Sequence, residues 1–116
     1  MERKLGIVII SPTVLSTIAR LTTLSVPGVA RMSPLGMHRL FGARGNDGVR
    51  VQVVDEAVVL DVYVIATTDV NMLQLSREIQ SKVTRALHEI VGMAVREVNV
   101  HIVDVVDVEM SQVQDR

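Results

Sequence analysis

Three histidines are the side chains of this chain best suited to metal binding or acid–base catalysis. His38, His88 and His101 are far apart in the sequence, and none belongs to an H-x-x-x-H pair or a similar ligand spacing. The surrounding apolar pattern places His88 on the outer face of a helix and His101 on the open face of a sheet. The sequence therefore predicts no metal ion, no cofactor and no catalytic histidine.

The carboxylates and hydroxyls also lack the arrangement that catalysis requires. Asp55 and Glu56 are adjacent at the predicted tip of a hairpin, whereas paired catalytic carboxylates work in a cleft away from bulk water. Asp61 is a lone acid among apolar strand residues, so we expect it on an exposed face. No serine or threonine lies in a sequence pattern that would bring it together with a histidine and an acid as a catalytic triad. We predict that the protein is not an enzyme.

A basic, glycine-rich stretch between residues 31 and 50 is the segment most suited to an anion. Backbone N–H groups of its glycines could hold a phosphate. It lacks both G-x-x-x-x-G-K-[ST] and G-x-G-x-x-G, so the first interpretation is a flexible connection, and contact with a lipid headgroup or nucleic acid is the alternative. The side chains of this candidate basic loop are Arg31, His38, Arg39 and Arg44.

Length and composition predict a single domain with a surface that contacts another subunit. The chain has 116 residues, a net charge of −1 and no cysteine, so neither a disulfide framework nor a global attraction to nucleic acid is expected. We expect a single domain at residues 1–107, a polar tail at 108–116, no signal peptide and a cytoplasmic location. Hydrophobic residues make up 48% of the chain and the mean hydropathy is +0.36, which predicts apolar surface covered by another subunit.

The spacing of apolar residues predicts five strands and two helices. Two helices that cover one face of a four- to five-stranded mixed sheet make a two-layer α+β sandwich of order β-α-β-β-β-α-β. The predicted elements are a strand at 5–10, a helix capped by Ser11 that begins at Pro12 and ends at about Leu24, a short strand at 29–33, hairpin strands at 49–53 and 57–66, a helix capped by Thr68 or Asp69 and ended by Gly92, and a strand at 95–103.

The face of the sheet away from the helices mixes polar and apolar side chains. In a strand, alternate residues point to the same face, so residues of the hairpin and the last strand are expected to share one surface. A half-apolar open face of this kind is a natural docking surface. The candidate interaction face consists of Arg50, Gln52, Val59, Asp61, Tyr63, Ile65, Asn99 and His101.

Several segments, in this order and spacing, resemble one bacterial family. They are residues 6–11 with 18–19, the turn Val26-Pro-Gly-Val29, the hairpin at 48–53 and 59–64, and residues 79–83 followed by 91–95 and 98–102. Together they resemble the alkaline shock protein family of envelope stress response proteins, also known as general-stress proteins of Gram-positive bacteria. Residues 66–71 depart from the family pattern, because they lack its Tyr-Gly and its later proline.

The resemblance implies a cytoplasmic domain without catalytic activity. Members of that family self-associate, gather at the inner face of the membrane through an integral-membrane partner, and support cell-envelope homeostasis under stress; some are linked to fatty-acid synthesis. The expected partners are therefore a second copy of the chain and an anchoring membrane protein. Direct membrane insertion is not expected, since it would use a basic amphipathic helix.

Two alternatives stay open from the residues alone. The first is a nucleic-acid-binding module that uses the basic loop, although the chain has one Phe, one Tyr and no Trp on which bases could stack. The second is a ligand-sensing regulator of a metabolic enzyme.

Overall fold

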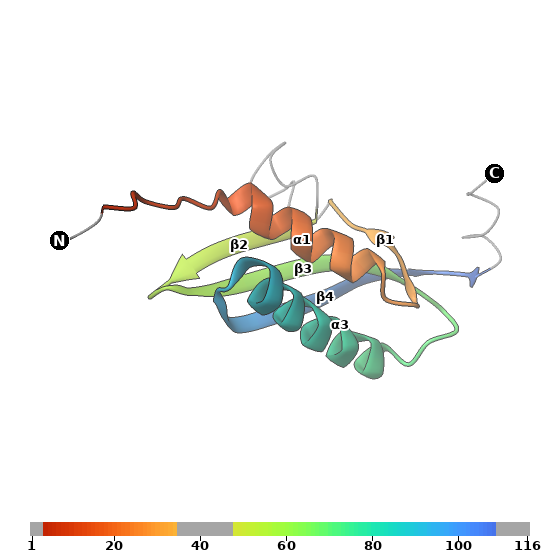
Figure 1. Cartoon of the computed structure of the whole chain (residues 1–116). Helices are drawn as coiled ribbons and strands as arrows, with labels where there is room; N and C mark the ends of the chain where they lie inside the picture. The colour runs from red at the N-terminus through yellow and green to blue at the C-terminus, as the bar shows by residue number, and fades with distance from the viewer. Residues whose placement is uncertain (1–3, 35–47, 109–116) are drawn as a thin grey trace.

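The structure, a computed structural model, describes residues 4–34 and 48–108. It is an α+β sandwich of one sheet and one helical layer (Figure 1). In chain order the elements are α1 (Pro12–Leu24), β1 (Val29–Met32), β2 (Val49–Val54), β3 (Ala57–Thr67), α3 (Met72–Ala86), the π-helical turn η2 (Leu87–Val91) and β4 (Ala94–Val106).

The sheet is mixed and is organised around β3. β4 pairs with β3 in parallel along its whole length, from Ala57 to Thr67. Because β4 occupies one edge of β3, β2 and β1 share the other edge and pair antiparallel with the first and second halves of β3 respectively. This arrangement confirms the predicted mixed sheet, with four strands in the described residues.

Both helices pack on one face of the sheet, as predicted. Alternate β3 side chains point toward them, and Val58, Leu60, Val62 and Val64 are all 0% exposed. The core is completed from the helices by the buried side chains Leu15, Ala19, Leu75, Ile79, Val83 and Leu87. The period-2 pattern of β3 and the helical stripe of α3 therefore meet in one aliphatic core.

Three of the four predicted helix boundaries are confirmed: the start of α1, its end at Leu24, and the end of the second helix at Gly92. Ser11 caps α1 by accepting a hydrogen bond from Thr13 N at 3.2 Å, with Pro12 at the first helical position. Gly92 adopts φ 82°, the left-handed conformation that ends the second helix. The predicted cap of α3 was wrong: Asn71 accepts from Gln74 N at 3.0 Å. Thr68 N donates to Val106 O at 3.0 Å and the Asp69 carboxylate accepts from Thr67 Oγ1 at 2.5 Å, so both residues belong to the connection that precedes the helix.

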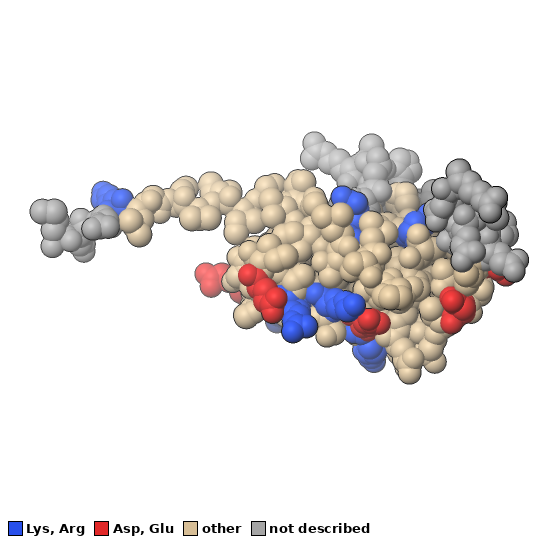
Figure 2. Space-filling view, turned by 45° about the vertical axis from the view of Figure 1, so that its right-hand side comes forward, with Lys and Arg blue, Asp and Glu red and all other residues tan. Residues whose placement is uncertain are grey.

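Residues 5–10 do not form a strand of the sheet, which corrects the first predicted element. They run away from the body as an extended segment in front of α1, the N-terminal arm (Figures 1 and 2). The physical reason lies in the topology: β3 already has β4 along one edge and β1 and β2 along the other. A strand in front of α1 would therefore have to pair at an outer edge of the sheet.

Candidate interaction face

The predicted face is assembled by three strands in register. Arg50, Asp61 and Asn99 form one row across β2, β3 and β4. Tyr63 and His101 pair in a neighbouring row across β3 and β4. Gln52 stands opposite Val59 in the row on the other side of Asp61. These side chains share the surface because none of the β3 residues is bulged and each therefore alternates regularly with the buried core positions.

Three of these side chains contact one another. His101 Nε2 lies 2.9 Å from Asp61 Oδ1, a diagonal contact between β4 and β3. The rings of Tyr63 and His101 are stacked, with centroids 4.4 Å apart. The Asp61 side chain is 16% exposed and the His101 side chain 41% exposed, so the cluster is half-buried although neither described helix covers it. We refer to these three residues as the Asp61–His101–Tyr63 cluster.

Ile65 belongs to the same face by register but differs in exposure. It stands opposite Arg31 of β1 and Asp104 of β4, and it is only 8% exposed. It lies outside the helix-facing core cluster. The open part of the candidate face is therefore the stretch from Val59 to Tyr63 with its neighbours on β2 and β4, and Ile65 contributes little accessible surface.

This geometry suits recognition better than catalysis. The cluster pairs an imidazole with a carboxylate, as hydrolases do, but the third group is a stacked phenol and not a nucleophile in hydrogen-bond reach of the histidine. Three pockets of the described chain are lined by other residues. In residues 4–34 and 48–108, no group of three His, Asp or Glu side chains could hold a metal ion.

The predicted basic loop cannot be placed as a unit. Arg31 is an exposed residue of β1 and so belongs to the sheet rather than to a loop. His38, Arg39 and Arg44 lie outside the described residues. His88, the histidine expected on an outer helix face, is exposed in η2.

The sequence placed Asp61, Tyr63 and His101 on one face but missed that they form a cluster. The i, i+2 spacing of Asp61 and Tyr63 was visible in the sequence, whereas their contact with His101 depends on the parallel register of β3 and β4.

None of the described helices is long and apolar enough to span a membrane.

Residues 1–107 match the alkaline shock protein 23 family, which is described by a cell envelope-related function. The chain belongs to this family. The match covers most of the chain and confirms the resemblance that the sequence motifs indicated. It also agrees with a curated relative, YqhY of Bacillus subtilis (strain 168), which is 30% identical over 118 residues, covering 97% of this chain and 87% of the relative.

Solved structures of the MamM CTD share the fold of this family member. Two variant structures align with TM-scores of 0.52 at 14% identity; one alignment covers 80% of this chain and 96% of the other, and the second covers 81% and 98%. A copper form aligns with a TM-score of 0.50 at 14% identity over 79% of this chain and 84% of the other. At this identity the likeness concerns the arrangement of strands and helices alone.

Proposed function

We propose that the protein is a non-enzymatic adaptor of the bacterial envelope stress response. It self-associates through the open sheet face and is held at the cytoplasmic side of the membrane by a protein partner. The family description supports the link to the cell envelope. The observation that carries the proposal is the half-buried Asp61–His101–Tyr63 cluster on a sheet face that none of the described helices covers.

The composition of the open face favours a protein partner. Val59 and Tyr63 offer apolar and aromatic surface, and Arg50 and Asn99 border it with polar groups. Aromatic residues and arginine are enriched at protein interfaces, and a tyrosine held by stacking loses little conformational freedom on binding. A second copy presents the same complementary set, as a two-fold interface requires.

Introducing a positive charge on the face tests self-association. Tyr63→Lys or Val59→Lys should weaken association about tenfold in sedimentation velocity, because each variant places an unpaired ammonium in the interface. Ser81→Lys, at an exposed position of α3, is the matched control and should leave the mass distribution unchanged. Unchanged association of both face variants would place the interface elsewhere.

Recruitment is tested separately with the purified protein. It should bind inverted membrane vesicles from the source bacterium, and protease treatment of the vesicles beforehand should abolish binding because the anchor is a protein. Equal binding to protease-treated vesicles would contradict recruitment by a protein partner.

A further inference from the structure

The N-terminal arm, residues 5–10, exposes more apolar surface than any other described segment of its length. Leu5, Ile7, Val8 and Ile9 are 86%, 85%, 87% and 81% exposed. Figure 2 shows the arm standing clear of the body. No described strand pairs with it. Six extended residues span about 20 Å, the length of an ordinary strand. Among the described residues, most of the apolar side-chain surface of the arm is therefore uncovered and its backbone pairs with no strand.

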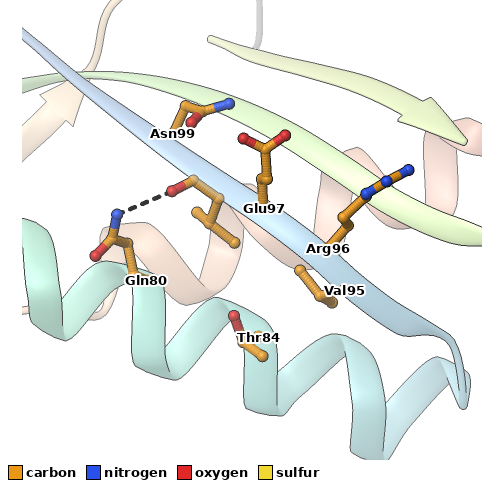
Figure 3. Close-up of a pocket in the computed structure, with 7 residues that line it drawn as sticks. Gln80, Thr84, Val95, Arg96, Glu97 and Asn99 are labelled. Carbon is orange, nitrogen blue, oxygen red and sulfur yellow. Dashed lines mark hydrogen bonds between the residues drawn. The ribbon is translucent and has the colours of Figure 1, made fainter. Parts of the chain in front are cut away.

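The same chain carries an unpaired strand edge. Among the described residues β4 pairs with β3 alone, so its outer edge has no strand neighbour. A groove of about 310 Å³ runs beside this edge, between Gln80 and Thr84 of α3 and residues 95–99 of β4 (Figure 3). Gln80 Nε2 donates to Val98 O at 3.0 Å, so this carbonyl points out of the sheet toward α3. That bond occupies one acceptor of the edge, and a further strand would pair with the other outward-facing backbone groups of β4, which have no strand partner among the described residues.

The direction of the arm matches the outer edge of β4. The base of the arm lies beside Ile90 and Val91, immediately before β4 begins, because these residues line one pocket with Ile9 and Ile10. An arm that enters a second copy from this same end runs antiparallel to β4 and parallel to β2. Antiparallel pairing is the more stable per residue, and β4 offers 13 residues against six in β2.

The junction with α1 directs the arm away from its own sheet. Ser11 is fixed as the helix cap, with φ −63° and ψ 141°, and Pro12 restricts it to extended conformations. Gly6, the one arm residue with positive φ, lies near the far end. A turn there would leave residues 7–10 still pointing outward, so a second copy is the better placed acceptor.

We propose that the N-terminal arm of one copy adds as an antiparallel strand to the outer edge of β4 in a second copy. Reciprocal exchange of two arms closes a two-fold dimer. Lipid would cover the apolar side chains but would leave the extended backbone without hydrogen-bond partners, which favours a sheet edge over a membrane. This contact is independent of the open sheet face, and both surfaces are available in one assembly.

The absence of cysteine from the sequence makes cross-linking decisive. We expect Val8→Cys chains mixed with Glu97→Cys chains to give a species of twice the chain mass with a short bifunctional maleimide. A mixture of Val8→Cys chains with Gln52→Cys chains, whose cysteine lies on β2, should not give this cross-linked species. The Val8→Cys/Glu97→Cys double variant tests whether the contact lies within one chain. If its cross-link forms within single chains and persists on dilution, exchange between copies is overturned. Equal yields from the two mixtures would overturn the assignment to β4.

A second measurement needs no thiols. Ile9→Asp, or deletion of residues 5–10, should weaken self-association about tenfold, whereas Leu73→Asp, at a 66% exposed position of α3, should have no effect. Unchanged association without the arm would overturn the proposal, and so would arm-dependent co-sedimentation with phosphatidylglycerol vesicles. A failure of the open-face proposal can be told apart from a failure of the arm proposal, because we expect Tyr63→Lys to leave the Val8–Glu97 cross-link in place.

Discussion

The Tyr63 ring lies flat against the His101 imidazole across the parallel strands β3 and β4, with centroids 4.4 Å apart and planes 9° apart. The same imidazole also contacts Asp61 through Nε2, which lies 2.9 Å from Oδ1 of the carboxylate. Each side chain therefore limits the rotamers of the next. An aromatic surface that is fixed before a partner arrives loses less entropy on binding, which is the property an adaptor face needs.

The Asp61–His101 contact should contribute modestly to stability. In a double-mutant cycle with Asp61→Ala and His101→Ala, we expect a coupling of about 0.5 kcal/mol in the free energy of unfolding, because water screens a half-exposed pair. Urea denaturation at low protein concentration measures it. The matched cycle uses Asp104→Ala with His101→Ala; the Asp104 carboxylate accepts instead from Val105 N at 2.8 Å, so its coupling should be near zero. Equal coupling in the two cycles would contradict a specific contact.

Among the glycines that the structure describes, Gly28 is expected to be the most sensitive to substitution. Its φ is +104°, and a Cβ there would lie 2.6 Å from Val70 Cγ1 and 3.3 Å from Leu75 Cδ1. Gly28→Ala should lower the free energy of unfolding by about 3 kcal/mol, the sum of backbone strain and overpacking. Gly92→Ala is the control, with φ +82° and no atom within 4 Å, and should cost about 1 kcal/mol. Similar losses of thermal stability in the two variants would show that the contact with Val70 is unimportant.

One substitution in the hairpin between β2 and β3 should increase the stability of the protein. Asp55 and Glu56 have φ values of 50° and 66°, the left-handed conformations of a type I′ turn, in which glycine is favoured at the second position. Glu56→Gly should raise the free energy of unfolding by about 0.5 kcal/mol, because relief of strain exceeds the entropy lost by glycine.

Glu56→Ala separates the backbone effect from the loss of charge, since it removes the carboxylate and keeps the strained conformation. It should leave the urea midpoint nearly unchanged. A gain equal to that of Glu56→Gly would assign the effect to charge.

Much of the fold was predictable because local patterns and the final structure agree. The alternation in β3 determined which residues are buried, and Ser11-Pro12 and Gly92 marked helix ends through their own backbone preferences. The strand pattern likewise placed the polar residues of the open face together. Val95 and Val98 are out of phase with strict alternation, and the structure accommodates this with a bulge at Arg96.

The two-layer arrangement follows from local periodicity, because the spacing of apolar residues in each segment decides which side chains are buried. The neighbours of each strand follow only from the way the whole chain packs. The parallel register of β3 and β4 brought His101 to Asp61 and Tyr63, and the contacts of Thr68 with Val106 and of Asp69 with Thr67 placed both residues in the connection before α3, which Asn71 caps. The packing of the whole chain also leaves residues 5–10 outside the sheet. Strand pairing depends on which edges the rest of the chain already occupies, and no local sequence pattern contains that information.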